Sequence, residues 1–351
     1  MTMRAVSLLD KLIATPSLSR QEGQTAAIIE EFLLSNGVLA RRCKNNVWAA
    51  SDSYDPSRPT LLLNSHHDTV KPAASYSLDP FSPIHRDGRI YGLGSNDAGA
   101  SVVSLTETFL RLRDEQLNVN LILAVTAEEE VSGKDGIELL LNEFRASGIT
   151  IDMAIVGEPT GLDAAIAERG LMVLDCTAHG VSGHAARNEG VNAIYTAIAD
   201  IETLRNFKFD RVSQTLGDIK ISVTQIAAGT QHNVIPDTCN FVADVRTTDA
   251  YSNAEVAEII SSVLQSDVRP RSTRLNASVI SIDHPLVKAA LKLGAEPFVS
   301  PTLSDRALLH NIPALKIGPG DSARSHTADE FIFESEIEEA IAFYYNLIKS
   351  L

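Results

Sequence analysis

Cysteine is scarce and scattered in this chain of 351 residues. The three cysteines, Cys43, Cys176 and Cys239, are odd in number and lack the CxxC spacing of a zinc or redox motif. This scarcity excludes a disulfide framework of the kind that holds small secreted domains together. We therefore expect reduced cysteines and a cytoplasmic protein.

Long apolar runs and an excess of positive charge are also absent. The sequence contains no stretch of about 18 apolar residues, the length that is needed to cross a bilayer. Asp10 and Lys11 interrupt the apolar N-terminal stretch, which argues against a signal peptide. Acidic residues outnumber basic residues by 45 to 30, and the net charge is −15. This balance argues against nucleic acid or an anionic membrane as the main partner and favours a neutral or cationic small molecule.

The remaining composition is that of an ordinary globular protein, with 44% hydrophobic and 21% charged residues. Residues 1–169 and 277–351 alternate apolar strand patterns with helical patterns, as α/β domains do. Residues 170–276 instead show the strand-helix-strand-strand-helix-strand order of a ferredoxin-like unit. We therefore predict an α/β catalytic domain in two parts, interrupted by an inserted ferredoxin-like α+β domain.

Several local elements can be predicted in the first part. Ser19 and Glu22 have the spacing of a capping box at the start of a helix that spans residues 19–37. Residues 71–95 form a long connection with no clear period, which in a compact domain is usually functional. Further strands and helices are expected at residues 40–50, 60–64, 98–113, 120–126, 135–146 and 153–156.

Polar residues follow the apolar strand at residues 60–64. His66 and Asp68 are two residues apart, so on a continued strand they would point to the same face. An imidazole there could bind a metal while the carboxylate fixes its ring. A strand end with a capping aspartate and two surface histidines explains this stretch equally well.

Other strand ends offer further carboxylates. The apolar strand at 120–126 is followed by Glu128, Glu129 and Glu130, whose mutual repulsion favours a cation more than it favours a solvated acidic loop. Each of these candidate metal ligands, taken singly, could instead have a purely structural role; Asp97, for example, could be the N-cap of a helix. Taken together they form a ligand set for zinc, cobalt or manganese, with room for a second metal. The further candidates are Asp97, Glu158 and His326.

The motifs around these residues resemble, in their order, those of one enzyme family. They are SHHDTV, GLGSNDAGAS, TAEEEVSG, VGEPT, SGHAA, HNVIP and SHTADE, between about residues 60 and 330. The family is that of the co-catalytic zinc amidohydrolases and peptidases, which includes acetylornithine deacetylase, succinyl-diaminopimelate desuccinylase and bacterial glutamate carboxypeptidase. The resemblance implies a mixed-sheet catalytic domain, an inserted lid and dimerisation domain, two zinc ions replaceable by cobalt or manganese, and a homodimer.

The resemblance also implies roles for individual residues. His66, rather than His67, would bind the first metal, because the pattern is His-x-Asp, and Asp68 would orient it. Glu129 would be the general base. The other implied metal ligands are Asp97 as the bridging residue, Glu158 for the first metal, and Glu130 and His326 for the second.

Three residues of the inserted domain match further family positions. His184 would reach the active site of a partner subunit and donate to the oxyanion, while Asn233 and Arg246 would contact substrate. Two departures, Ser65 for the usual glycine and residues 98–101 (AGAS) for Met-Lys-Gly-Gly, put the inferred substrate size in doubt. The resemblance further predicts a cis peptide bond between Asp97 and Ala98.

The function that we expect is removal of an acyl group from the α-nitrogen of an amino acid. The sequence segments GEPTG, ERGLMVLD and HTADE are most similar to those of the acetylornithine deacetylase branch. We therefore expect N2-acetylornithine as the substrate and arginine biosynthesis as the pathway. N-acetylcitrulline, N-succinylornithine or a lysine-pathway analogue remain open, as does a dipeptidase or exopeptidase. From another class, a non-catalytic small-molecule binding protein remains open, whereas a dinucleotide enzyme is set aside because residues 92–99 lack GxGxxG spacing after a strand.

Overall fold

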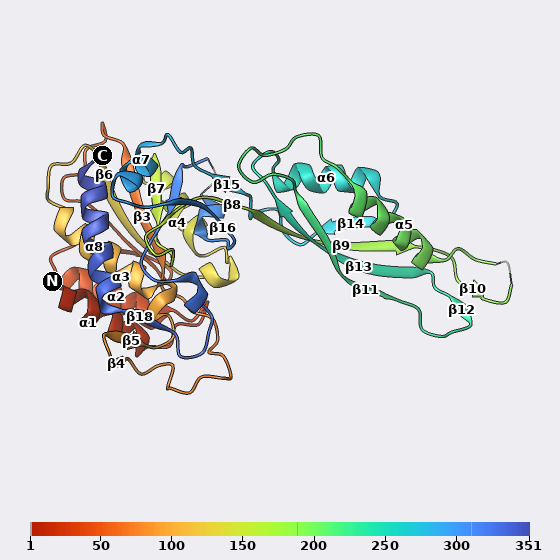
Figure 1. Ribbon diagram of the computed structural model, residues 1–351, viewed down its shortest axis with the longest axis horizontal. Coiled ribbons are helices and arrows are strands. Elements are labelled where there is room, and N and C mark those ends of the chain that lie inside the picture. The colour runs from red at the N-terminus through yellow and green to blue at the C-terminus, as the bar shows by residue number, and fades with distance from the viewer. Residues whose placement is uncertain (1, 188, 310) are drawn as a thin grey trace. The chain divides into compact units, whose positions relative to one another are not determined.

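The computed structural model describes residues 2–187, 189–309 and 311–351 (Figure 1). Two compact units are present. The first comprises Met1–Ile166, Ile280–Phe298 and Ser304–Leu351, and the second Ala167–Val279 and Val299–Leu303. The segment 170–276, predicted as an insertion, lies within the second unit. Residues 299–303, predicted as part of the catalytic domain, cluster with the second unit instead.

A mixed sheet forms the centre of the first unit. Strands β6, β3, β7 and β17 are neighbours and run parallel, because apolar runs buried on both faces suit parallel strands. Antiparallel strands flank this group on both sides. Along the sheet the order is β1 (Arg41–Cys43), β2 (Asn46–Ala50), β6 (Asn120–Thr126), β3 (Thr60–His66), β7 (Met153–Val156), β17 (Ala314–Lys316), β8 (Ala164–Glu168) and β15 (Ser278–Val279), and β16 (Pro297–Ser300) pairs with β8.

Helices cover both faces of this sheet. Successive side chains of a strand point to opposite faces, and on β3 the side chains of both faces are buried. Leu61 and Leu63 belong to the main core, together with apolar residues of five helices, while Leu62 is buried on the opposite face. On that opposite face Phe144 packs edge-on against Trp48. The five helices are α1 (Thr2–Ile13), α2 (Gly23–Ser35), α3 (Ala100–Leu112), α7 (Pro285–Lys292) and α8 (Glu334–Lys349), and the sixth, on the other face, is α4 (Ile137–Ala146).

A second, small sheet corrects the prediction for residues 71–95. This connection contains β4 (Ile84–Arg86) and β5 (Arg89–Tyr91), and β5 pairs with β18 (Phe331–Phe333). Strands of three residues carry too little periodicity to be found from sequence. The pairing ties the connection to the segment directly before α8.

His85 on β4 links three elements of the first unit. Its Nε2 lies 2.9 Å from Asp10 Oδ1 in α1, and its Nδ1 lies 3.1 Å from Glu334 Oε1 in α8. Burial alone lowers the pKa of the ring, but the hydrogen bonds to Asp10 and Glu334 raise the pKa of His85 above its usual value. Both ring nitrogens donate only when the ring is protonated.

The contribution of His85 to stability should therefore depend on pH. Because the folded state raises the pKa, the stabilisation is fully present below about pH 6.5, the usual value for histidine, and is lost as pH rises through the folded pKa. Urea unfolding of the metal-free protein and of His85→Ala should differ most in weakly acidic buffer and converge in alkaline buffer. A difference in unfolding free energy that stays constant with pH would contradict this.

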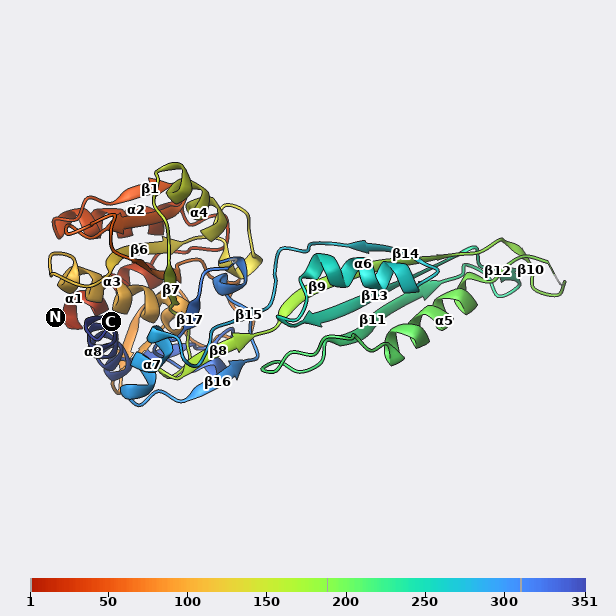
Figure 2. The same cartoon turned by 90° about the horizontal axis from the view of Figure 1, so that it is seen from above.

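The second unit has the ferredoxin-like topology that was predicted. Its sheet order is β11-β13-β9-β14, antiparallel throughout, and residues of α5 and α6 pack with one face of the sheet into a separate core (Figure 2). A short pair, β10 and β12, was not predicted. The elements are β9 (Gly170–His179), β10 (Gly183–His184), α5 (Ala193–Asn206), β11 (Lys220–Ala228), β12 (Val234–Ile235), β13 (Thr238–Thr247), α6 (Asn253–Val263) and β14 (Asp267–Pro270). Among the described residues, no helix is long and apolar enough to cross a membrane.

Candidate metal centre

Three adjacent parallel strands deliver polar residues to one edge of the main sheet. His66 ends β3, and its register partner Thr126 ends β6, directly before the turn that carries Glu128 to Glu130. On the other side of β3, β7 ends at Val156, two residues before Glu158. Because carboxyl ends of parallel strands meet at one sheet edge, residues far apart in sequence become neighbours there.

Asp97 reaches the same edge from an irregular turn rather than from a helix N-cap, because the backbone of Asp97 and Ala98 is not helical. The turn spans Ser95–Gly99, and the peptide bond between Asp97 and Ala98 is cis, as the resemblance predicted. The buried carboxylate of Glu330 accepts hydrogen bonds from the backbone N–H groups of Asn96 (2.8 Å) and Asp97 (2.9 Å). The backbone around Asp97 is thus held by a residue of the SHTADE motif.

The predicted ligands of the first unit lie together. One ligand atom each of His66, Asp97 and Glu130 falls within 4.8 Å of the others. The two oxygens of Asp97 face different histidines, with Oδ1 3.3 Å from His66 Nε2 and Oδ2 3.7 Å from His326 Nε2. His326 Nε2 also lies 3.0 Å from Glu130 Oε1.

Two more carboxylates approach the same imidazole. Glu158 Oε1 and Glu129 Oε2 each lie 3.9 Å from His66 Nε2. Asp97 therefore occupies the position between the two histidines, with Glu158 near one histidine and Glu130 near the other. This is the arrangement that a bridging carboxylate between two metals requires.

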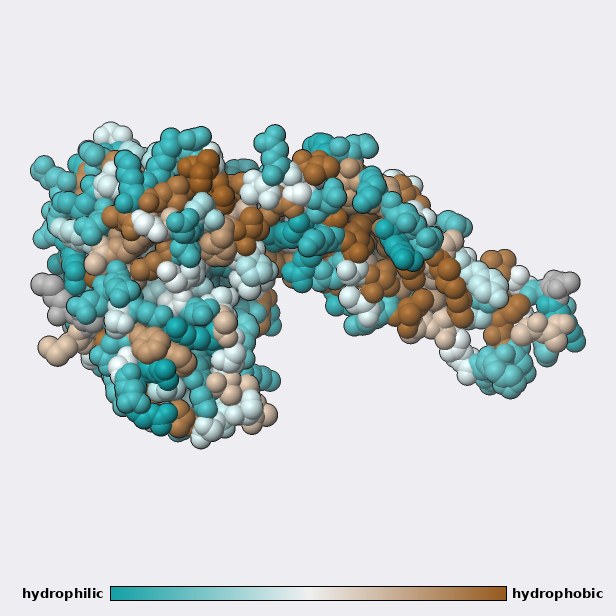
Figure 3. Space-filling model, in the orientation of Figure 1, coloured by the Kyte–Doolittle hydropathy of each residue, from teal (hydrophilic) through white to brown (hydrophobic). Residues whose placement is uncertain are grey.

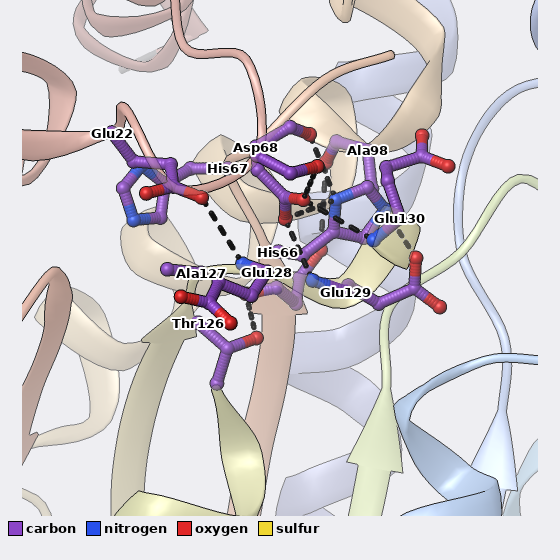
Figure 4. A network of polar contacts seen from close by, with 12 residues as sticks. Glu22, His66, His67, Asp68, Ala98, Thr126, Ala127, Glu128, Glu129 and Glu130 are labelled. Atoms are coloured by element: carbon purple, nitrogen blue, oxygen red, sulfur yellow. Dashed lines mark hydrogen bonds and ion pairs between the residues drawn. The ribbon is translucent and has the colours of Figure 1, made fainter. Parts of the chain in front are cut away.

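Asp68 contacts His66 through both its backbone carbonyl and its carboxylate, and its role in orienting that ring stays a prediction. The closer partner of His66 Nδ1 is the backbone carbonyl of Asp68, at 3.0 Å, while the carboxylate oxygen Oδ1 lies 3.4 Å away. The carboxylate also accepts hydrogen bonds from the backbone N–H groups of Glu129 (3.0 Å) and Glu130 (3.2 Å) (Figure 4). Asp68 thus contacts both the histidine and the glutamate turn.

The electrostatics of the cluster favour a cation. Burial raises the pKa of Glu158 to about 8 despite the positive charges of His66 and Lys316. Burial likewise raises the pKa of Glu129 well above its usual range, with a further contribution from the charge of Glu158. The hydrogen bond to Glu130 raises the pKa of His326 to about 9. Buried carboxylates that repel one another are stabilised when positive charge is shared among them.

The donor set fits two divalent transition metals. It offers two imidazoles and three carboxylates without a thiolate, and zinc, cobalt and manganese accept such ligands. His66, Asp97 and Glu158 would hold one ion, and Asp97, Glu130 and His326 the other. The resemblance leaves Glu129 outside this ligand set, although it lies as close to His66 as Glu158 does.

His67 is excluded from the cluster by its own contacts. Its Nδ1 lies 2.9 Å from Thr25 Oγ1, and its Nε2 lies 3.0 Å from the backbone carbonyl of Asn45. Burial lowers the pKa of His67 to about 4, so this ring is neutral and structural.

Exchanging His66 or His67 for alanine should distinguish a metal-binding histidine from a structural one. His66→Ala is expected to reduce the metal content below two ions per chain, because it removes a ligand. His67→Ala should retain the full metal content but unfold at lower urea concentration, since it leaves buried partners unsatisfied. Metal analysis after dialysis, together with urea unfolding, distinguishes them, and loss of metal from His67→Ala alone would reverse the assignment.

The three predicted residues of the inserted domain lie in the second unit. His184 and Asn233 are brought together, since His184 pairs with Val234 and the backbone N–H of Ala185 donates to the Asn233 carbonyl (3.0 Å). Arg246 lies near the opposite end of β13, and its Nε and Nη2 donate to the two carboxylate oxygens of Asp244 (2.8 and 3.1 Å). Their roles toward substrate remain predictions.

Sequence reasoning missed three buried carboxylates that support the cluster. Glu330 received no role, although the SHTADE motif contains it. The position of Asp305 after Ser304 in the sequence suggests either attraction of a substrate amine or a helix N-cap, but the N-cap is Ser304. Asp305 is instead buried, accepting hydrogen bonds from Asn64 Nδ2 (2.9 Å) and Thr126 Oγ1 (2.8 Å). Glu22 was read as half of a capping box, but α2 has no side-chain cap from it.

Comparison with known sequences identifies relatives along most of the chain. The family model for peptidase family M20/M25/M40 matches residues 62–350. A succinyl-diaminopimelate desuccinylase from Halorhodospira halophila is 26% identical over 99% of this chain and 98% of its own length. Another, from Paracidovorax citrulli, is 30% identical over 67% of this chain and 66% of its own length.

Solved structures share the fold. A tripeptidase from Staphylococcus aureus superposes with a TM-score of 0.75 at 20% identity, covering 99% of this chain and 98% of that chain. A dinuclear metal-binding peptidase of the M20 family from Bacillus subtilis gives 0.72 at 19% identity, covering 99% of this chain and 97% of that chain. The family match and the ligand cluster agree: the chain belongs to peptidase family M20/M25/M40 and is a metal-dependent hydrolase of amide bonds.

Proposed function

We propose that this protein uses two divalent metal ions to remove the acyl group from the α-nitrogen of a small N-acyl amino acid. Zinc is the first choice for both ions. The observation that carries the proposal is the position of Asp97 between His66 and His326. Glu129 lies beside the same imidazole without being required as a ligand. A cluster of this kind serves amide hydrolysis, whereas a binding protein would not need an additional glutamate at that point.

The residues would divide the work as follows. When bound, the metal ions supply an acidified water and polarise the amide carbonyl. Glu129 accepts the proton of the attacking water and passes it to the nitrogen of the leaving amine, which cannot depart as an anion. Burial raises the pKa of Glu129, and a raised pKa helps a carboxylate to hold the proton that it must later return. Asp68 keeps the Glu129 backbone in place during both transfers.

The acyl group is the finer part of the proposal. The motifs of the chain favour N2-acetylornithine and arginine biosynthesis, but the relatives named above do not support that choice. Their names instead favour an N-succinyl amino acid such as N-succinyl-diaminopimelate. We therefore place the N-succinyl substrate first and N2-acetylornithine second.

A panel of substrates tests the proposal directly. The zinc- and cobalt-loaded protein would be incubated with N-succinyl-diaminopimelate, N-succinylornithine, N2-acetylornithine, N-acetylcitrulline and a set of dipeptides, and the released amine would be quantified. Preferred cleavage of one N-acyl amino acid supports the proposal and names the acyl group. Preferred cleavage of dipeptides would make the protein an exopeptidase, and no cleavage with any metal would overturn the proposed function.

We also propose that the second unit mediates a homodimer. Its strand β11 is an edge of the sheet, and exposed apolar side chains lie on β11 and on α5: Ile226 is 54% exposed, Ile198 53% and Tyr195 71%. Figure 3 shows apolar side chains among the hydrophilic ones on this unit. Exposed sheet edges and exposed apolar side chains are typical of surfaces that pair with a second copy.

The dimer can be tested by charge substitution. Ile198→Glu is expected to convert a dimer into a monomer, because it places a charge in the apolar surface. The matched control is Leu39→Glu, which changes an apolar residue of the first unit that is 78% exposed. Light scattering behind size exclusion, at several concentrations, measures the mass. A monomeric parent protein, or a dimer that survives Ile198→Glu, would contradict this assignment.

A further inference from the structure

Glu22 is a fully buried carboxylate that the proposed chemistry does not use. It precedes α2 and is 0% exposed. In the part of the chain that the structure describes, no ion pair of Glu22 with a lysine or arginine is found. Burying a carboxylate without a cation is costly, so its hydrogen bonds must hold it in place.

Those hydrogen bonds connect the N-terminal segment to the glutamate turn. The Glu22 carboxylate accepts from the backbone N–H of Arg20 (2.5 Å), from Asn45 Nδ2 (2.9 Å) and from the backbone N–H of Glu128 (3.3 Å). Figure 4 shows Glu22 beside this backbone, on the side away from His66. Glu22 therefore fixes the residue directly before Glu129.

Ser19 makes a parallel connection to the same turn. Its Oγ donates to Asp68 Oδ2 at 2.7 Å, and Asp68 accepts the backbone N–H groups of Glu129 and Glu130. Three consecutive N–H groups of the turn, from Glu128 to Glu130, thus all donate to buried carboxylates. Ser19 and Glu22, which looked like a capping box in sequence, serve this turn rather than the helix.

The turn needs such support because its backbone is unusual. Glu128 has a φ of 59°, in the left-handed region that side chains other than glycine rarely adopt. A Cβ on Gly133 would lie 1.8 Å from Glu128 Oε2, so the turn is also closely packed. A small shift of this backbone would move both the Glu129 carboxylate and the Glu130 ligand.

We infer that Glu22 is a positioning residue for the general base, acting through the backbone N–H of Glu128, with Ser19 supporting the same turn through Asp68. The inference rests on the proposed function for its kinetic consequence only, because the hydrogen bonds themselves can be tested without substrate or metal. Glu22 lies outside residues 62–350, where the family model matches.

The test compares Glu22→Ala and Glu22→Gln with Glu107→Ala. Glu107 is an equally buried glutamate, 0% exposed, which pairs with Arg4 and Arg111 away from the centre. Glu107→Ala therefore controls for the general loss of a buried carboxylate. Glu22→Gln keeps an acceptor oxygen for the backbone and remains informative if Glu22→Ala fails to fold.

The first measurement is hydrogen exchange of the metal-free proteins. Glu22→Ala should speed exchange of the amides of the Glu128 to Glu130 turn by about tenfold or more, as expected for loss of one charge-assisted hydrogen bond. Glu22→Gln should speed it less, and Glu107→Ala should leave it unchanged. Equal exchange of this turn in Glu22→Ala and the parent protein would overturn the inference, whatever the enzyme hydrolyses.

The second measurement is kinetic. With the substrate found by the panel, Glu22→Ala should lower kcat by about 10- to 100-fold with little change in KM, as misplacement of a catalytic group does. Glu22→Gln should recover most of that loss, and Glu107→Ala should retain the parental kcat. Equal losses of kcat in Glu22→Ala and Glu107→Ala would reduce Glu22 to a structural residue. A parent protein without any hydrolysis would refute the proposed function and leave the exchange result to decide the role of Glu22.

Discussion

Exchange of Glu129 for Gln is expected to lower kcat by about 100- to 10 000-fold, the range that general acid–base catalysis contributes. Glutamine preserves the shape of the side chain but cannot carry the proton from the attacking water to the leaving amine. The metal content should stay at the parental level, because the two proposed sites take their ligands from His66, Asp97, Glu130, Glu158 and His326 and none from Glu129. Steady-state kinetics and metal analysis on the same preparation measure both quantities.

The control for this exchange is the neighbouring residue. Glu128→Gln changes a carboxylate of the same turn that no proposed metal site uses and whose contact with Arg20 is a long 3.9 Å. Glutamine keeps the shape of the side chain, and Glu128 carries neither proton nor metal in the proposed mechanism, so activity should remain close to that of the parent. If Glu129→Gln kept the parental kcat, or if it lost metal as well as activity, Glu129 would not be the base.

The second large effect is expected from Asp97→Asn. Both oxygens of Asp97 face a histidine of the cluster, His66 on one side and His326 on the other. An amide offers one oxygen and no negative charge, so the affinity for both metals should fall and kcat/KM with it. Competition with a chelator measures the affinity, and the metal content after dialysis should drop below two per chain.

Asp68→Asn provides the comparison for Asp97→Asn. Asp68 supports His66 and the glutamate turn without being a ligand, and loss of such outer partners typically costs about 10- to 100-fold in metal affinity or activity. Asp97→Asn should exceed that loss. A smaller effect from Asp97→Asn than from Asp68→Asn would mean that Asp97 does not bridge the metals.

The strands and the ligands could be predicted because their signals are local. The apolar runs at 120–126 and 153–156 coincide with β6 and β7, and polar residues at strand ends meet wherever the strands are parallel neighbours. The family resemblance then supplied the order of the ligands, from His66 to His326. The ferredoxin-like unit followed from its element order alone.

What the sequence did not reveal depends on contacts over long distances. Glu22, Asp305 and Glu330 each bond to groups more than 100 residues away, and a buried carboxylate has no spacing that distinguishes it from an exposed one. The turn at Ser95–Gly99 was missed for a related reason, because its backbone is set by Glu330 rather than by local propensity. Capping boxes depend on two residues only, so the pattern at Ser19 matched by coincidence.

The place of β17 in the main sheet has a consequence for biosynthesis. This strand, Ala314–Lys316, lies between β7 and β8, which are made more than 140 residues earlier. While the ribosome is still translating the chain, β7 and β8 lack the neighbour that joins them, and His326 does not yet exist. The ferredoxin-like unit has nearly all its residues by then and can fold first, as domains generally do during synthesis. The ligand cluster can thus be complete only after His326 has been translated, so a nascent chain that stops before this residue is inert.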